Sequence, residues 1–331
     1  MNRKKIALLT GISGQDGSYL AEYLLSIGYE VHGIIRRNSV AENQQYRVDG
    51  IRDELNIHYG DLTDQTSIEK ILTEVKPDEI YNLGAQSHVR ISYDIPQFTA
   101  QVNALGVLNL LEAYKRICPN AKFYQASSSE MFGLTIEDDG FQRETTIMNP
   151  VSPYGCAKVF GYNIVRHYRR AYGLHACNGI LFNHESPRRG SNFVTSKVVK
   201  TACMIKLGML DKLEMGNMDS FRDWGHSKDY VKAMHMILNY NVADDFVVST
   251  METRSVRDMC DVVFNHLGLD YNDYILQNPK FMRPEELPYL KGDSTKIRTT
   301  LGWKPTYTFE EMMFEMTDHW MDVLQGIKSN R

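Results

Sequence analysis

The chain has 331 residues, of which 43% are apolar and 24% are charged, and its formal net charge is −4. These values are typical of globular proteins and exclude a disordered chain, a collagen and a coiled-coil rod. The small negative charge argues against nucleic-acid binding, and no apolar run reaches the roughly 20 residues of a membrane helix. The five widely spaced cysteines form no C-x-x-C pair, so we expect reduced thiols, a cytoplasmic location and no metal site.

The first half of the chain alternates between strand-like and helix-like segments. Short runs rich in apolar and β-branched residues predict strands at 5–10, 30–35, 56–59, 79–83, 122–126 and 176–182. Apolar residues at helical spacing predict helices at 14–27, 65–75, 96–118 and 154–172. This alternation predicts an α/β fold with a doubly wound parallel sheet and helices on both faces.

The second half is less regular. Its patterns predict helices at 195–207, 227–238, 255–267 and 309–324, and one further strand at 246–249. No linker rich in glycine, serine or proline separates the halves, so we expect a smaller second domain interleaved with the first. The first domain is expected to span 1–183 plus about 224–252, and the second about 184–223 plus 253–331.

A glycine-rich loop follows the first predicted strand and opens the first predicted helix. Its glycines, Gly11, Gly14 and Gly17, would let the backbone turn tightly and approach a pyrophosphate, which the helix N-terminus attracts. The alternative is an ordinary strand–helix turn. No Gly-Lys-Ser/Thr follows, which excludes a Walker-type loop. The same loop contributes Ser13, Gln15 and Asp16 to the predicted cofactor site.

The end of the second strand indicates which cofactor binds. An NAD site places an acidic residue there, whereas this strand ends in Arg36 and Arg37, which suit the 2′-phosphate of NADP. The alternative is a solvated surface pair. The residues after the third and fourth strands complete the predicted cofactor site: Asp61, Leu62, Leu83, Gly84 and Ala85.

Tyr154 and Lys158 are four residues apart and therefore share one face of a predicted helix. A nearby ammonium, together with the positive charge of an oxidised nicotinamide, favours the phenolate form of a tyrosine. Lowering a tyrosine pKa to neutrality is a shift of about 3 units, or roughly 4 kcal/mol. The pair is common on surface helices, so its value depends on its position downstream of the glycine-rich loop.

Ser128 and Glu130 follow the fifth predicted strand. The carboxyl ends of strands line the ligand crevice in this type of sheet, so a hydroxyl and a carboxylate there could move protons. The alternative is that the serines cap a turn and that Glu130 is solvated.

Together these motifs resemble the extended short-chain dehydrogenase/reductases, which have a Rossmann-type sheet. Four long stretches resemble, more specifically, the GDP-mannose 4,6-dehydratase family within that group: 10–20, 81–89, 178–190 and 216–226. The similarity extends over nearly the full chain. It implies NADP as the cofactor, GDP-mannose as the substrate and a homodimer or homotetramer.

The resemblance implies roles for individual residues. Tyr154 resembles the catalytic base, Lys158 its partner, and Glu130 the carboxylate that takes the C5 proton of the sugar. Ser128 stands where many members have threonine. His184, Arg189 and Ser87 match cofactor contacts. The positions that resemble GDP-sugar contacts are Ser87, Ser128, Glu130, Asn183, Lys197, Arg222, Arg283 and Glu286.

The implied reaction converts GDP-mannose to GDP-4-dehydro-6-deoxymannose with loss of water, the first step toward sugars such as GDP-fucose or GDP-rhamnose. The alternatives within this fold are a nucleotide-sugar epimerase, a 4-keto reductase and a dehydratase with added reductase activity. An alternative from another class is a non-catalytic NADP-binding sensor, which would have no need of Tyr154, Lys158, Ser128 and Glu130 together.

Overall fold

The main element of the fold is a seven-stranded parallel sheet with strand order β11-β6-β5-β4-β1-β2-β3. The computed structural model describes residues 3–37, 46–282 and 284–327. The strands of the sheet are β1 (Ile6–Thr10), β2 (Glu30–Ile35), β3 (Leu55–Tyr59), β4 (Glu79–Asn82), β5 (Lys122–Ser128), β6 (Ala176–Leu181) and β11 (Asp245–Val248). They coincide closely with the seven predicted strands, so the predicted doubly wound sheet is confirmed.

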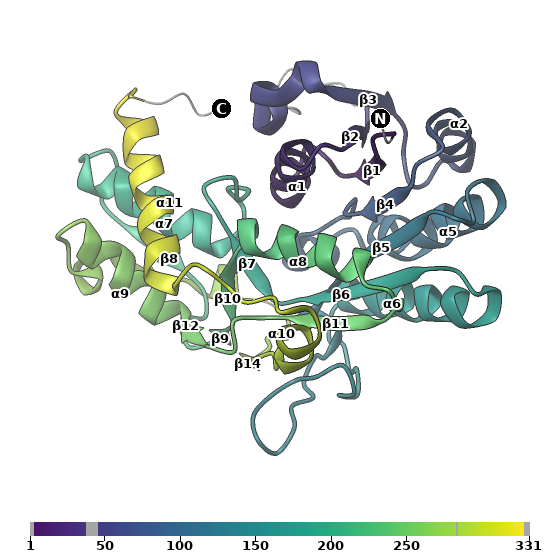
Figure 1. Ribbon diagram of the computed structural model, residues 1–331. Helices are drawn as coiled ribbons and strands as arrows, with labels where there is room; N and C mark the ends of the chain where they lie inside the picture. The colour runs from purple at the N-terminus through teal and green to yellow at the C-terminus, as the bar shows by residue number, and fades with distance from the viewer. Residues whose placement is uncertain (1–2, 38–45, 283, 328–331) are drawn as a thin grey trace.

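Helices cover both faces of this sheet (Figure 1). One face packs against α1 (Gln15–Ser26) and α8 (Ser227–Asn239). The other packs against α2 (Gln65–Val75), α5 (Gly106–Ile117) and α6 (Pro153–Tyr172). Neighbouring side chains of a strand point to opposite faces, which is why Leu8 and Leu9 of β1 are both fully buried but lie in different cores.

The predicted helix 96–118 is divided. The structure has α4 (Pro96–Ala100), a π-helical turn η2 (Gln101–Leu105) and then α5. Inside the π turn, the buried Asn103 side chain accepts from the Gln86 N–H at 2.8 Å and donates to the Gln86 C=O at 2.8 Å. These two bonds fix the segment after β4 that carries Ser87. A single π turn inside a helix is too short for the spacing of apolar residues to reveal it.

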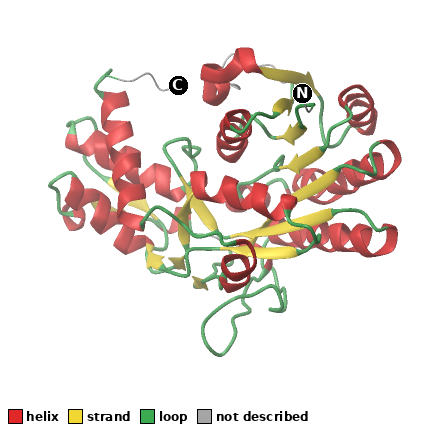
Figure 2. Cartoon of the chain, in the orientation of Figure 1, coloured by secondary structure: helices red, strands yellow, loops and turns green. Residues whose placement is uncertain are grey.

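Three helices form a second core at one end of the molecule, α7 (Val194–Lys206), α9 (Val256–His266) and α11 (Phe309–Leu324) (Figures 1 and 2). Short strands connect this core to the main sheet: β7 (Asn183–Glu185), β8 (Leu213–Met215), β9 (Phe221–Arg222), β10 (Trp224–His226), β12 (Arg254–Ser255), β13 (Ile275–Gln277) and β14 (Tyr289–Leu290). These strands were not predicted, and neither were α3 (Val89–Ser92), α10 (Thr295–Leu301) and the 3-10 helix η1 (Tyr46–Glu54). Within the described ranges, no helix is both long and apolar enough to cross a membrane.

The strand order reverses between β1 and β4, which are neighbours in the sheet. The segments that leave these two strands diverge to opposite faces, and ligands of open α/β sheets bind at such a switch point. The glycine-rich loop after β1 and the segment 83–88 after β4 meet there.

Candidate active site

The glycine-rich loop is packed so closely that side chains are excluded from it. Gly11 has φ +69°, and a Cβ added there would lie 2.9 Å from the Gly84 N atom. A Cβ at Gly17 would lie 2.2 Å from the Gly11 carbonyl oxygen. Gly14 precedes the first residue of α1 and has no side chain that could cap the helix. The backbone N–H groups of this N-terminus are therefore suited to a phosphate, and the loop fits a dinucleotide.

A cavity of about 370 Å³ lies between this loop and the ends of β1, β2 and β4. Ten of the predicted cofactor residues line this cavity. They are Gly11, Ser13, Gly14, Arg36, Asp61, Leu62, Leu83, Gly84, Ala85 and Ser87. Arg36 is exposed, with its guanidinium 5.9 Å from the Phe98 ring centre. Arg37 is exposed and is not among the residues that line this cavity.

Tyr154 and Lys158 lie on the first turns of α6, and both are nearly fully buried. The Ser152 hydroxyl caps this helix by accepting from the Gly155 N–H at 3.0 Å, and Pro153 occupies the first turn. Lys158 Nζ donates to the Ala126 carbonyl oxygen at 2.8 Å. That bond ties the ammonium to β5, whose last residue is Ser128.

Ser128 and Glu130 lie beside this tyrosine. The Ser128 side chain is hydrogen bonded to Tyr154, and its Oγ accepts from the Glu130 N–H at 3.2 Å. Glu130 is 8% exposed, so the predicted alternative of a solvated carboxylate is wrong. The other alternative, that a serine caps a turn, is confirmed, because Ser128 caps the short 3-10 helix η3 (Ser129–Met131). The structure thus brings all four predicted catalytic residues together at the carboxyl end of β5.

Burial dominates the electrostatics of Tyr154. Burial raises the pKa of Tyr154 to about 12, and the nearby Glu130 charge adds to this effect. Burial also lowers the pKa of Lys158 to about 8, against a smaller opposing effect of Asp16. Without the positive charge of an oxidised nicotinamide, Lys158 does not bring the pKa of Tyr154 toward neutrality. The ammonium lies 5.6 Å from the ring centre and bonds to Ala126, and burial outweighs it.

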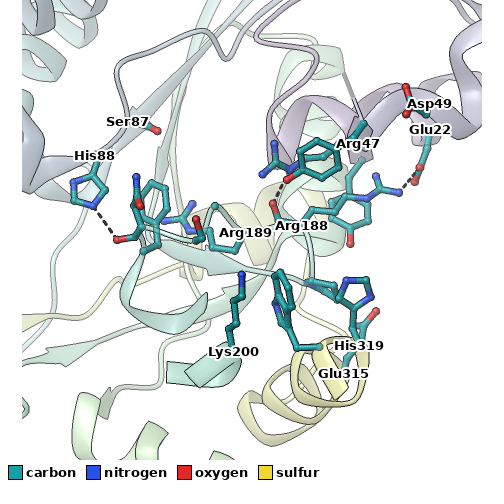
Figure 3. A pocket seen from close by; sticks show the side chains of 18 of the residues that line it. Glu22, Arg47, Asp49, Ser87, His88, Arg188, Arg189, Lys200, Glu315 and His319 are labelled. Atoms are coloured by element: carbon teal, nitrogen blue, oxygen red, sulfur yellow. Dashed lines mark hydrogen bonds and ion pairs between the residues drawn. The ribbon is translucent and has the colours of Figure 1, made fainter. Parts of the chain in front are cut away.

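A second cavity, of about 1010 Å³, lies next to the first, and Ser87 and Arg47 line both. In Figure 3, Lys200 and His319 border it from α7 and α11, and Arg47 borders it from the opposite side. The segment 187–193 forms part of its wall, and here Arg188 forms an ion pair with Glu22 at 2.5 Å. The predicted cofactor residue Arg189 also lines this cavity and pairs with buried Glu185 at 2.9 Å.

Two residues of these cavities were missed by the sequence analysis as site residues. Arg47 donates to the carbonyl oxygens of Ser13, at 3.3 Å, and Arg188, at 2.8 Å. Arg47 thereby joins the glycine-rich loop to the segment 187–193. Neither Arg47 nor Arg188 lies in a spacing motif, and only an excess of basic residues in both segments could have indicated them.

The predicted substrate residues are distributed over several elements of the second half. Arg222 on β9 is largely buried and donates to Glu286 at 3.0 Å and to the carbonyl oxygens of Phe221 and Leu287. Lys197 on α7 lies 3.8 Å from the Phe281 ring centre. Asn183 is half-buried on β7. Arg283 lies outside the described residues.

Two of the predicted cofactor residues face each other across the loop. His184 Nε2 lies 2.8 Å from Asp16 Oδ2, and the Gln15 side chain donates to the His184 carbonyl oxygen at 3.1 Å. In the parts of the chain that the structure describes, no group of three or more histidine, cysteine or acidic side chains could hold a metal ion.

Comparison with known proteins agrees with this geometry. Residues 8–316 match the family model described as GDP-mannose 4,6 dehydratase. The chain is 47% identical to the GDP-mannose 4,6 dehydratase of Cricetulus griseus, over 95% of this chain and 90% of that protein. It is 48% identical to GDP-mannose 4,6 dehydratase 1 of Arabidopsis thaliana, over 98% of this chain and 92% of that protein.

Solved structures share the fold. UDP-glucose 4-epimerase of Thermus thermophilus, in complex with NAD, is 25% identical with a TM-score of 0.82, over 95% of this chain and 98% of that one. RMD of Pseudomonas aeruginosa, complexed with NADPH, is 22% identical with a TM-score of 0.80, over 96% of this chain and 100% of that one. Because the family model covers most of the chain and the sequence identity is high, the chain belongs to the GDP-mannose 4,6-dehydratase family.

Proposed function

We propose that this chain dehydrates GDP-mannose to GDP-4-dehydro-6-deoxymannose by moving a hydride from C4 to C6 of the sugar. The observation that carries the proposal is the buried cluster of Ser128, Glu130, Tyr154 and Lys158 in a chain of this family. An epimerase or a 4-keto reductase of the same fold has no need for a second proton-transfer group beside the tyrosine. Buried Glu130 therefore favours the dehydratase.

A nicotinamide cofactor, when bound, supplies hydride storage between C4 and C6 and, in its oxidised form, a positive charge that favours the Tyr154 phenolate. Tyr154 takes the C4 hydroxyl proton as C4 is oxidised to a ketone. Glu130 takes the C5 proton, which the ketone has acidified, and passes it, directly or through the Ser128 hydroxyl, to the C6 hydroxyl, which leaves as water. Tyr154 then returns its proton to C5 as hydride reaches C6, so the balance is one water lost.

Lys158 contributes charge rather than proton transfer in this scheme. With a pKa of about 8, its ammonium stays protonated at neutral pH and is held toward β5 by the Ala126 carbonyl oxygen. The charge is lost as the pH rises above 8.

The same proposal includes NADP rather than NAD as the cofactor. Arg36 lines the smaller cavity at the end of β2, where an NAD site would carry an acidic side chain. A guanidinium binds a phosphate well, since it is always charged and presents several donors.

The proposal further includes the division into a cofactor domain and a substrate domain with the boundaries predicted from the sequence. The separate core of α7, α9 and α11 supports it. We also propose a homodimer or homotetramer and a cytoplasmic location, which light scattering and cell fractionation would test.

The test of the reaction is Glu130→Gln. We expect this variant to bind NADP as the wild type does but to turn over about 100- to 10,000-fold more slowly, the usual contribution of a general base. The assay follows the mass of GDP-mannose with catalytic NADP+, where dehydration removes one water, about 18 Da, without net NADPH accumulation.

Glu74→Gln is the matched control, since Glu74 is an exposed side chain on α2. It should leave turnover unchanged. If Glu130→Gln dehydrates at the wild-type rate, the role of Glu130 is wrong. If wild-type enzyme leaves the mass of GDP-mannose unchanged, the proposed reaction itself is wrong, and an epimerase becomes the better explanation.

A further inference from the structure

His184 has an unusual pair of hydrogen-bond partners. Its Nδ1 lies 2.7 Å from the carbonyl oxygen of Phe182, and its Nε2 lies 2.8 Å from Asp16 Oδ2. The ring is stacked on Tyr230, with centroids 4.5 Å apart and planes at 19°. The side chain is only 11% exposed. Both ring nitrogens are therefore used by contacts within the protein.

These partners determine the protonation state of the ring. A carbonyl oxygen can only accept, so Nδ1 must carry a hydrogen. A carboxyl group is a much stronger acid than an imidazolium, so a proton shared between the two resides on the ring and Asp16 is ionised. The other Asp16 oxygen accepts from the Gln15 amide at 3.2 Å. An ionised carboxylate also only accepts, so Nε2 must carry a hydrogen as well. A histidine that donates from both nitrogens is an imidazolium.

The balance of charges around the ring agrees with this assignment. Burial alone would lower the pKa of His184, but the Asp16 carboxylate outweighs burial and the net effect raises it. Burial likewise would raise the pKa of Asp16, but His184 lowers it below its usual value. Arg189, on the turn after β7, opposes the charge on His184. Other titratable groups that face the pair are Glu185 on β7, Lys158 and Tyr154 on α6, Tyr230 on α8 and Tyr124 on β5.

The ion pair joins the two sides of the site. Asp16 belongs to the first turn of α1, between Gly14 and Gly17 of the glycine-rich loop, and His184 belongs to β7, where the chain leaves the main sheet for the second core. Two neutral bonds run beside it, from Gln15 to the His184 carbonyl oxygen and from the Ser186 hydroxyl to Gln15 at 2.8 Å. Asp16 also acts electrostatically on both Tyr154 and Lys158.

We propose that His184 is held as an imidazolium and that, paired with Asp16, it is a positioning residue that keeps the glycine-rich loop in register with β7. Neither side chain acts on the sugar itself. His184 keeps the loop and the second half of the site in one arrangement and neutralises the Asp16 charge next to Tyr154 and Lys158. This inference rests on the proposed function only for its consequence for turnover, because the protonation state is a property of the chain.

The direct test is ¹⁵N NMR of protein labelled at its histidine side chains, without substrate. The His184→Asn variant assigns the signal by its disappearance. We expect His184 to titrate above the ordinary pKa of histidine, with both of its nitrogens protonated at pH 7. A single unprotonated His184 nitrogen at pH 7 would overturn the proposal, whatever the enzyme catalyses.

Asp16→Asn tests the role of the pair. Removing the carboxylate should lower the His184 titration midpoint by about one to three pH units, the usual influence of a close opposite charge. Protonating the ring cannot restore the ion pair once Asp16 is neutral, so turnover of this variant should stay reduced throughout the His184 titration, whereas the lowered midpoint is a readout that a merely structural defect would not give. An unchanged midpoint, or wild-type turnover by this variant, would refute the positioning role.

Asp64→Asn makes the same acid-to-amide change at the N-cap of α2, away from this pair, and should leave the His184 signals unchanged. If Asp16→Asn does not fold, the wild-type NMR measurement still decides the protonation state. If the NMR result holds but no variant or wild type dehydrates GDP-mannose, the proposed reaction fails and the imidazolium stands.

Discussion

The two sides of the candidate site are built in different ways. On the cofactor side, the main chain defines the geometry, because Gly11, Gly17 and Gly84 approach one another too closely for side chains. On the proposed substrate side, side chains define it, and Arg222 is oriented by Glu286 and by the Leu287 carbonyl oxygen, 64 and 65 residues further along the chain. The cofactor side is therefore encoded by a short segment of sequence, whereas the proposed substrate side forms only when segments far apart in the chain come together on folding.

This difference predicts a different tolerance to change. The main-chain packing around the glycine-rich loop cannot accommodate an added atom, because that atom would have to displace backbone atoms that are already closely packed. Long side chains can rotate or be replaced in function by a neighbour, so the loss of one of them removes only its own bond. The following substitutions test this contrast, in order of decreasing effect.

Gly17→Ala should have the largest effect. The new Cβ would lie 2.2 Å from the Gly11 carbonyl oxygen and 2.6 Å from Ile12 Cα, so the loop must move. We expect a cost of about 3 kcal/mol or more, seen as a lower melting temperature and as NADP affinity reduced by at least about 100-fold. Thermal unfolding and fluorescence titration with NADP measure the two effects.

Gly50→Ala is the control, because nothing lies within 4 Å of the Cβ that it adds. It should leave both quantities close to the wild type. Near-normal NADP binding by Gly17→Ala would show that the loop adapts, and the contrast between the two sides would fail.

Arg36→Ala should have the next largest effect, on cofactor choice. A hydrogen bond to a charged group contributes about 1.5 to 3 kcal/mol, so NADP affinity should fall by about 10- to 100-fold. NAD affinity should change little, since NAD has no 2′-phosphate. Arg37→Ala, at an exposed position that does not line the cavity, should have a smaller effect. Equal losses for NADP and NAD with Arg36→Ala would contradict the role of Arg36.

The contrast between the two sides also explains how much of this structure the sequence predicted. Most of the seven long strands were readable because they are largely buried, as in β6, where every residue is buried, whereas the edge strand β3 has no buried residue. The short strands were not readable. β9 and β12, for example, have two residues each and pair across more than 30 positions of the chain. Such segments have no periodicity to detect, because tertiary contacts alone make them extended.

The site follows the same rule. Glycine spacing and the four-residue interval between Tyr154 and Lys158 are local, and the structure places these residues as predicted. The contacts of Arg47 with Ser13 and Arg188 join segments 34 and 141 residues apart, and no local pattern encodes them. The high pKa of Tyr154 in the absence of a cofactor depends on burial, which a residue pair in the sequence does not reveal.

Glu286→Gln should have the smallest effect of the three. In the structure the Arg222 guanidinium lies 3.0 Å from the Glu286 carboxylate. In the variant the amide oxygen of the glutamine can still accept from Arg222, but the attraction between opposite charges is lost. Arg222 keeps its bonds to the carbonyl oxygens of Phe221 and Leu287. We therefore expect a loss of about 0.5 to 1.5 kcal/mol, seen as a rise of about 2- to 12-fold in the KM for GDP-mannose with little change in kcat.

Steady-state kinetics on Glu286→Gln would be compared with Glu252→Gln, whose carboxylate lies on the surface 3.7 Å from Arg254 and should contribute nothing measurable. If kcat falls steeply while KM is unchanged, Glu286 acts in the chemical step and not in orienting Arg222. In that case the proposed substrate side would be as intolerant as the glycine-rich loop. The distinction between a side built from backbone and a side built from side chains would then not describe how this site works.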